Sequence, residues 1–126
     1  MEAKRVYLCG PMTGIEDFNR PAFRECAAML REQGFIVMTP ADCYQGNSWE
    51  EGMKKDIPAM LSCDRVSLLD GWEKSRGARL EVFIARELGM RVETLEETFL
   101  SIPTKPLEEI RGELRGKVIT ADTYES

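Results

Sequence analysis

The sequence predicts an α/β fold, a flavodoxin- or Rossmann-like three-layer sandwich built on a parallel sheet of four to five strands. Two observations predict it. Short β-rich runs alternate with longer helical stretches, and these stretches are long enough for the right-handed crossovers that join parallel strands. The 126 residues, 43% of them apolar, suffice for one hydrophobic core. We therefore expect a single domain over residues 1–126, with its core in residues 1–93 and a C-terminal extension over residues 94–126 that is a candidate part of an oligomer interface.

The first strand and the first helix have clear boundary signals. Residues 5–9 are a mostly apolar run that ends at the Gly-Pro break beginning with Gly10, which predicts a buried strand. Apolar side chains recur every three or four positions over residues 21–33, so we expect an amphipathic helix with Asn19 as its N-cap. Residues 35–38 form the next apolar run and predict the second strand.

The middle of the chain continues the alternation. Ser48, followed three residues later by Glu51, is a capping-box pattern, and it predicts a helix over residues 48–62. Pro58 lies inside this stretch, so the helix is expected either to kink there or to split in two. Residues 65–69 are the third apolar run and predict a third strand.

The last predicted helix of the core begins after Ser75, a suitable N-cap, and runs from residue 76 or 77 to residue 88. Residues 90–93 then predict a short fourth strand. The sequence patterns that predict helices and strands weaken from residue 94 onward. Residues 107–114 are compatible with a surface helix, and residues 118–126 with an edge strand or a loose tail.

Composition excludes several classes of function. The net charge is −5 and the pI about 4.9, and no cluster of Lys and Arg is long enough to bind a nucleic-acid polymer. No apolar run approaches the roughly 20 residues that span a bilayer, and the N-terminus has no signal-peptide pattern. We therefore expect a cytoplasmic protein with no membrane partner.

Cysteine and histidine usage narrows the chemistry further. The chain has no histidine and no Cys-x-x-Cys pair, which excludes Cys/His zinc sites and histidine-based triads. We expect no metal and no cofactor. The four cysteines are expected to be reduced and buried; they are Cys9, Cys26, Cys43 and Cys63. Any acid–base chemistry must then depend mainly on carboxylates.

Ligands of open parallel sheets bind at the carboxyl ends of the strands. The loop after the first strand begins and ends with glycine, so its amides can approach a phosphate or a base. The residues after the third strand open a helix whose N-terminus favours anions. The expected substrate-binding residues are Gly10, Pro11, Met12, Thr13, Gly14, Asp70, Gly71, Ser75, Arg76, Gly77 and Arg79.

The same residues also have plain structural interpretations. The loop over residues 10–14 is then only a tight turn, Glu81 a solvated helix residue, and Asp56 one more charge beside two lysines. Trp49 and Trp72 lie near predicted loop mouths, where they can stack on a base. Packing in the core or at an interface is the commoner role of tryptophan.

The order of these pieces resembles the nucleoside 2-deoxyribosyltransferase superfamily. The resemblance rests on Tyr7 in the first strand, the Gly-Pro-Met-Thr-Gly loop, Asp56, the Leu-Asp-Gly that ends the third strand, and Ser-x-Gly-x-x-x-Glu ending at Glu81. It covers residues 6–92. The superfamily also contains 2′-deoxynucleoside 5′-phosphate N-hydrolases and pyrimidine-nucleotide N-glycosidases. The chain looks most like a small phage and bacterial branch.

The resemblance implies a role for each catalytic residue. Glu81 matches the glutamate nucleophile that attacks the anomeric carbon, Tyr7 a tyrosine that orients it, and Asp56 an aspartate near the sugar hydroxyls and the base. Ser75 falls where the transferases carry aspartate and the monophosphate hydrolases serine. Arg79 departs from the hydrolases, which often have glycine there.

The implied activity is cleavage of the N-glycosidic bond of a nucleoside or a (deoxy)nucleoside 5′-monophosphate, by hydrolysis or by transfer to another base. Cleavage develops positive charge on the sugar, which a carboxylate stabilises and traps covalently, while a second carboxyl of raised pKa, for which Asp56 is the candidate, protonates the base. Two alternatives stay open. One is a catalytically silent nucleotide-binding module on the same fold, and the other an unrelated flavodoxin-like domain with a solvent-facing Glu81 of ordinary pKa.

The resemblance also implies a homodimer or a higher homo-oligomer. Transferases of the superfamily complete their sites with residues from a partner's C-terminus, for which Asp122 is a candidate here. The helix predicted over residues 48–62 is a candidate interface. Its apolar side chains are Trp49, Met53, Ile57, Met60 and Leu61.

Overall fold

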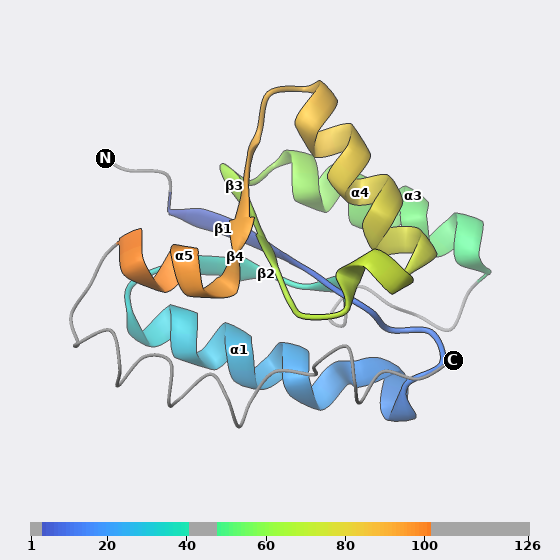
Figure 1. Ribbon diagram of the computed structural model, residues 1–126, viewed down its shortest axis with the longest axis horizontal. Helices are drawn as coiled ribbons and strands as arrows, with labels where there is room; N and C mark the ends of the chain where they lie inside the picture. The colour runs from blue at the N-terminus through green and yellow to red at the C-terminus, as the bar shows by residue number, and fades with distance from the viewer. Residues whose placement is uncertain (1–3, 41–47, 102–126) are drawn as a thin grey trace.

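The computed structural model describes residues 4–40 and 48–101 and confirms the predicted α/β class. Within these residues the sheet has four strands, all parallel, in the order β2-β1-β3-β4 (Figure 1). The strands are β1 (Arg5–Cys9), β2 (Ile36–Met38), β3 (Arg65–Leu68) and β4 (Arg91–Thr94). The helices are α1 (Arg20–Glu32), α3 (Trp49–Leu61), α4 (Arg76–Glu87) and α5 (Leu95–Ser101). Short 3-10 helices, Glu16–Asn19 and Trp72–Lys74, precede α1 and α4.

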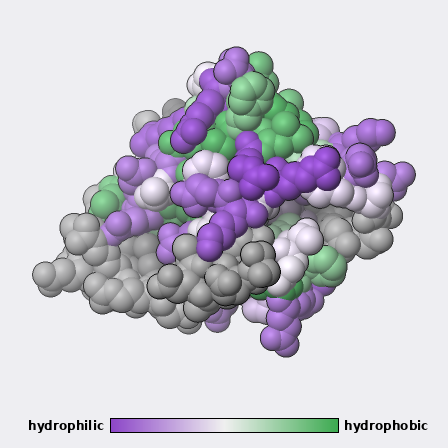
Figure 2. All heavy atoms as spheres, turned by 45° about the vertical axis from the view of Figure 1, so that its right-hand side comes forward, coloured by the Kyte–Doolittle hydropathy of each residue, from purple (hydrophilic) through white to green (hydrophobic). Residues whose placement is uncertain are grey.

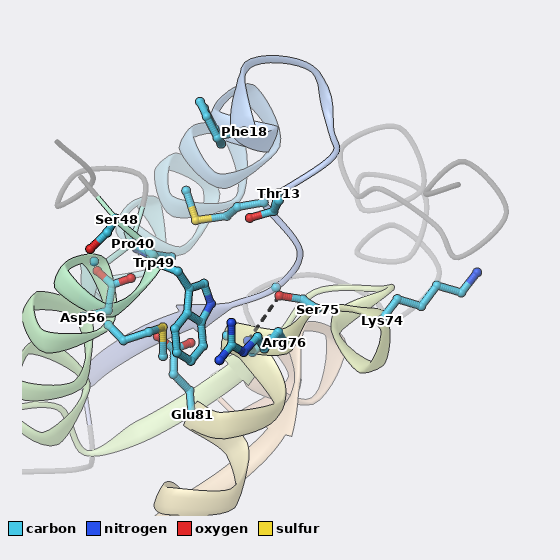
Figure 3. A pocket seen from close by; sticks show the side chains of 16 residues that line it. Thr13, Phe18, Pro40, Ser48, Trp49, Asp56, Lys74, Ser75, Arg76 and Glu81 are labelled. Atoms are coloured by element: carbon cyan, nitrogen blue, oxygen red, sulfur yellow. Dashed lines mark hydrogen bonds between the residues drawn. The ribbon is translucent and has the colours of Figure 1, made fainter. Parts of the chain in front are cut away.

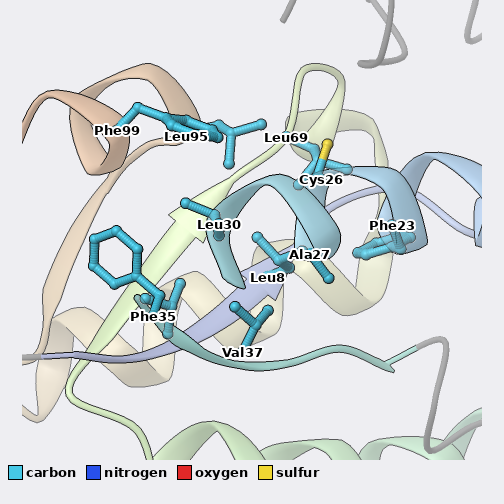
Figure 4. Close-up of a cluster of buried hydrophobic side chains, with 11 residues drawn as sticks. Leu8, Phe23, Cys26, Ala27, Leu30, Phe35, Val37, Leu69, Leu95 and Phe99 are labelled. Carbon is cyan, nitrogen blue, oxygen red and sulfur yellow. The ribbon is translucent and has the colours of Figure 1, made fainter. Parts of the chain in front are cut away.

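Helices cover both faces of the sheet, which gives the three predicted layers. α1 and α5 lie on one face, and α3 and α4 on the other (Figure 1). Successive side chains of a strand point to opposite faces, so β1 supplies both cores. Val6 and Leu8 join the cluster under α1 and α5, which Figure 4 shows around Leu30, whereas Tyr7 and Cys9 join the cluster under α3 and α4.

Two helix starts differ in how they are capped. Ser48 caps α3 as predicted, because its Oγ accepts the amide of Glu51 at 3.2 Å. Asn19 occupies the N-cap position of α1, but its side chain makes no capping bond. It has a left-handed backbone, with φ of 62°, and its amide donates instead to the backbone oxygen of Pro11 at 3.0 Å. The prediction that the Asn19 side chain caps this helix is therefore wrong. The Asn19 side chain holds the loop after β1.

Pro58 does not split the predicted helix, since α3 runs continuously from Trp49 to Leu61. A proline removes one i to i−4 hydrogen bond. Here the loss falls in the last turn of the helix, where few further bonds depend on it. One continuous α3 keeps the residues of its first turns in a fixed relation to α4.

The sequence predicted a core that ends at residue 93, but in the structure the packed core continues beyond this residue. α5 follows β4 directly, and its Leu95 and Phe99 are buried in the cluster with α1. Thr94 and Glu97 cap this helix reciprocally. The amide of Glu97 donates to Thr94 Oγ1 at 3.1 Å, and the amide of Thr94 donates to Glu97 Oε1 at 2.8 Å.

A buried polar network joins β3, β4 and α5. Arg65 is 2% exposed, and its Nη1 lies 3.0 Å from Oε2 of Glu93. The same oxygen accepts from Thr98 Oγ1 at 2.7 Å, and Arg91 Nε lies 2.8 Å from Oε1 of Glu93. Ser67 of β3 pairs with Thr98 at 2.7 Å. Because a buried charge needs partners, this network fixes where α5 docks on the sheet.

Exposed apolar side chains gather on the layer formed by α3 and α4. Leu61, Phe83 and Leu88 are exposed there, and a hydrophobic patch is visible at the top of Figure 2 above a mostly hydrophilic face. The helix expected to form an interface contributes less to this surface than its sequence indicates, since Met53 and Met60 are buried within the chain itself.

Several expectations lie outside the described residues. These are the predicted helix over residues 107–114, the strand or tail over residues 118–126, Asp122 and Cys43. Cys9, Cys26 and Cys63 are buried and are not joined in disulfides, as the sequence predicted for them. Among residues 4–40 and 48–101, no helix is long and apolar enough to cross a membrane.

Gly10 is the point at which β1 leaves the sheet, and the space there is tight. A Cβ at Gly10 would lie 2.9 Å from Cβ of Leu69 and 3.5 Å from Cζ of Phe23. We expect Gly10→Ala to lower the free energy of unfolding by about 1–3 kcal/mol, the usual range for overpacking. Gly52→Ala is the control, because a Cβ there meets nothing within 4 Å, and alanine should stabilise the helix by about 0.5–1 kcal/mol. Urea denaturation measures both, and a Gly10→Ala variant as stable as the wild type would contradict the expected clash.

Candidate active site

A pocket of about 570 Å³ lies beyond the carboxyl end of β1, between α3 and the start of α4 (Figure 3). Eight of the residues predicted to be catalytic or to bind substrate line it. They are Gly10, Met12, Thr13, Asp56, Ser75, Arg76, Gly77 and Glu81. The loop after β1, the helix before β3 and the helix after β3 therefore meet at one place, which is the edge of the sheet expected for a ligand.

Glu81 forms the inner wall of this pocket and is only 3% exposed. It lies on the face of α4 that packs on the sheet, together with Ala78, Val82 and Ala85. Its carboxyl group is bound at both oxygens. The Tyr7 hydroxyl donates to Oε2 at 2.8 Å, and the Cys9 thiol contacts Oε1 at 3.4 Å. The interpretation of Glu81 as a solvated helix residue is therefore wrong.

Burial shifts the ionisation of this group. Desolvation raises the pKa of Glu81 from its ordinary value of 4.5 to about 8, and the negative charge of Asp56 adds to the rise. The hydrogen bonds from Tyr7 and Cys9 oppose it, because they favour the ionised carboxylate. Burial, followed by the charge of Glu81, also raises the pKa of Tyr7 well above 10, so the tyrosine stays protonated and donates.

Asp56 faces the same pocket from α3. Burial raises the pKa of its carboxyl from 3.8 to about 6. Its Oδ1 is buried, and no hydrogen-bond partner for this atom exists in the described part of the chain. A buried carboxyl oxygen without a partner is unfavourable in the free protein, and it is available to a ligand.

The start of α4 combines a cap with a cation. Ser75 is the N-cap as predicted, and its Oγ accepts the amide of Ala78 at 3.2 Å. The guanidinium carbon of Arg76 lies 3.6 Å from the centre of the Trp49 ring, and both residues line the pocket (Figure 3). Gly77 permits this approach of α3 to α4, since a Cβ there would lie 3.1 Å from Sδ of Met53.

Some residues predicted to bind substrate do not line the pocket. Arg79 is exposed, and its guanidinium donates to the backbone oxygen of Glu73 at 3.0 Å. The others are Pro11, Gly14, Asp70 and Gly71. Helical geometry explains the case of Arg79. It lies two residues before Glu81, so it falls on a different face of α4 from Glu81.

The pocket also contains residues that the sequence did not indicate. Phe18 lines it from the left-handed turn that contains Asp17, Phe18 and Asn19, with φ between 53° and 62°. Asp and Asn adopt this backbone more often than other non-glycine residues, so Asp17 and Asn19 are a weak signal for it, whereas Phe18 gives none. Cys9 does not line the pocket but contacts Glu81, whereas the sequence indicated only a small buried hydrophobe. Among the described residues, no group of three or more Cys, Asp or Glu side chains is arranged to hold a metal ion.

The raised pKa of Glu81 predicts a pH dependence of stability. Between 4.5 and about 8 the folded state binds this proton more tightly than the unfolded state, so the free energy of unfolding should fall as the pH rises through that window. Glu81→Gln should remove the part of this fall that Glu81 causes and leave the part that Asp56 causes below about pH 6. The variant should therefore be stabilised relative to wild type by a few kcal/mol more at pH 8 than at pH 5, since one pKa unit corresponds to about 1.4 kcal/mol. Denaturation at both pH values tests this. Glu87→Gln, an exposed change on the same helix, should leave the pH dependence as it is, and an equal effect of both variants would contradict the assignment.

The geometry can be compared with known protein families. No curated protein matches the chain. Residues 4–94 match the family described as a domain of unknown function, DUF4406, and this match includes all four strands, the loop after β1 and every pocket residue named above. Since the match spans well over half of the 126 residues, the chain belongs to this family.

Proposed function

We propose that this protein cleaves the N-glycosidic bond of a nucleoside or a (deoxy)nucleoside 5′-monophosphate, with Glu81 as the nucleophile. The observation that carries the proposal is the buried Glu81 carboxyl, held by Tyr7 at 2.8 Å in the wall of a pocket that Asp56 also lines. The resemblance of the motifs to the nucleoside 2-deoxyribosyltransferase superfamily supports the same assignment.

The proposed reaction uses the two carboxyl groups differently. A carboxylate oxygen of Glu81 attacks C1′, the new C1′–O bond forms, and the bond between C1′ and the base nitrogen breaks with its electron pair going to the base. Asp56 donates the proton that the departing base needs. Water or a second base then attacks C1′, the C1′–O bond to Glu81 breaks, and the Asp56 carboxylate takes up the proton that the attacking group loses, which gives hydrolysis or transfer.

This division of roles requires an ionised Glu81 beside a protonated Asp56. The pKa of Glu81, about 8, lies above that of Asp56, about 6, so at pH 7 a protonated Glu81 beside an ionised Asp56 is favoured. Positive charge developing on the sugar favours ionisation of Glu81, as do its two donors. The free protein therefore rests mainly in the opposite protonation state, and substrate binding shifts it.

The pocket walls favour a nucleotide over a bare sugar. Trp49, Phe18 and Met12 offer aromatic and apolar surface for a base. Arg76 brings a positive charge to the pocket at the N-terminus of α4, where a phosphate is also favoured by the helix dipole. We therefore place the 5′-phosphate at Arg76 rather than at Arg79.

The second candidate function is a catalytically silent nucleotide-binding module. The raised pKa of Glu81 favours it, because a carboxyl that is mostly protonated at neutral pH is a poor nucleophile.

Homo-oligomerisation and a cytoplasmic location stay predictions from the sequence.

The central test is turnover of a panel of nucleosides and 5′-monophosphates, with and without a free acceptor base, followed by chromatography. We expect release of free base, and Glu81→Gln should slow it at least 1000-fold because the nucleophile is lost. Glu87→Gln makes the same chemical change on the exposed side of α4 and should keep wild-type turnover. Ligand-induced thermal shifts without any turnover would refute the enzyme and support the binding module.

The position of the phosphate has its own test. Arg76→Gln should raise the KM for a 5′-monophosphate about tenfold more than the KM for the matching nucleoside, since one charge-assisted contact contributes about 1.5–3 kcal/mol. Arg79→Gln should change this ratio less, because its guanidinium is engaged with Glu73 outside the pocket. Equal effects of Arg76→Gln on both substrates would contradict phosphate binding at this residue.

A further inference from the structure

We infer that Cys9 is a positioning residue for Glu81: its thiol donates to Oε1 while Tyr7 donates to Oε2, and the two together fix the direction of the carboxylate in the pocket. The contact itself is independent of the reaction, and its catalytic consequence rests on the proposed function. The sequence offered Cys9 only as a buried thiol, and nothing in its local pattern indicates this contact.

Strand geometry explains why two donors reach one carboxyl group. Tyr7 and Cys9 lie two residues apart on β1, so both side chains point to the face covered by α3 and α4. Both are fully buried. Tyr7 Oη lies 2.8 Å from Oε2 of Glu81, and Cys9 Sγ lies 3.4 Å from Oε1. A rigid central strand thus holds both oxygens of a side chain that α4 supplies.

The thiol has a second acceptor, and this makes its contact sensitive to charge. Cys9 Sγ lies 3.6 Å from the backbone oxygen of Ala78 as well. A thiol carries one proton, so it serves one acceptor at a time. An ionised Glu81 is a stronger acceptor than a carbonyl oxygen, whereas a protonated Glu81 competes less well. The contact therefore strengthens when Glu81 takes the form that attacks C1′.

The other groups that face Glu81 do not replace this donor. Tyr7 occupies Oε2, and Asp56 contributes only a negative charge, which opposes ionisation. Burial and the neighbouring charge of Glu81 raise the pKa of Cys9, so the thiol keeps its proton throughout the neutral range. Cys9 is thus the group that supports the ionised state at Oε1.

The test measures the pKa of Glu81 directly, in the full chain and without substrate, by carbon-13 NMR of labelled glutamate carboxyls. Glu81→Gln identifies the resonance. Cys9→Ala removes the donor and should raise the pKa by roughly half a unit, whereas Cys9→Ser supplies a stronger hydroxyl donor and should lower it. Cys26→Ala removes a buried thiol from the opposite core and should leave the pKa unchanged.

A packing role predicts a different result. If Cys9 only fills space, both substitutions should lower stability without moving the pKa of Glu81 in opposite directions, and that outcome would overturn the inference even if turnover is observed. The inference is supported if the pKa of Glu81 is lowest in Cys9→Ser, intermediate in the wild type and highest in Cys9→Ala. In that case kcat at neutral pH should be higher for Cys9→Ser than for Cys9→Ala. The same pKa order without turnover on any substrate would support the contact and refute the proposed function, so the two failures are distinguishable. Because Cys9→Ala only removes an atom, it keeps the test valid if Cys9→Ser does not fold.

Discussion

A carboxyl group inside a protein needs hydrogen-bond donors, and within residues 4–40 and 48–101 Glu81 takes both of its donors from β1. This requirement connects the parts of the fold that form the pocket. It fixes the buried face of α4 against the central strand, because Ala78, Val82 and Ala85 pack there beside Glu81. It also brings the N-terminus of α4 beside the loop that leaves β1. The sheet order makes this possible, since β1 and β3 are neighbours and α4 follows β3.

Two close approaches complete the same pocket. Gly10 lets the chain pass Leu69 as it leaves β1, and Gly77 lets α4 approach Met53 of α3. α3 in turn supplies Asp56 and the Trp49 ring beneath Arg76. The glycines therefore matter here for the volume they leave to their neighbours. A side chain at Gly10 would press on Leu69, and one at Gly77 would press on the thioether of Met53.

The sequence predicted those features, strands and helix caps, that depend mainly on neighbouring residues. Apolar runs bounded by Gly and Pro located the strands, and Ser75 was recognised as a cap because capping depends on neighbouring residues. α5 was missed although Thr94 and Glu97 form a capping box, since a seven-residue helix is too short to show periodicity. The burial of Glu81 could not be read from its own helix. Only the resemblance to the nucleoside 2-deoxyribosyltransferase superfamily indicated a role for Glu81, because its hydrogen-bond partners lie more than 70 residues away in the sequence.

The chain shows how it stabilises a carboxyl that has only a structural role, and Glu81 differs from that case. Glu93 is also buried, but two arginines, Arg65 and Arg91, lie within 3.0 Å of its oxygens. The donors to Glu81 are an uncharged hydroxyl and an uncharged thiol, and one buried oxygen of Asp56 has no partner among the described residues. A buried carboxyl and a half-buried one placed in this way beside a pocket reduce the stability of the free protein. A hydrogen-bond donor placed at Asp56 Oδ1 and a positive charge developing near Glu81 would offset these two costs. A sugar hydroxyl and the transition state of the proposed cleavage would supply them.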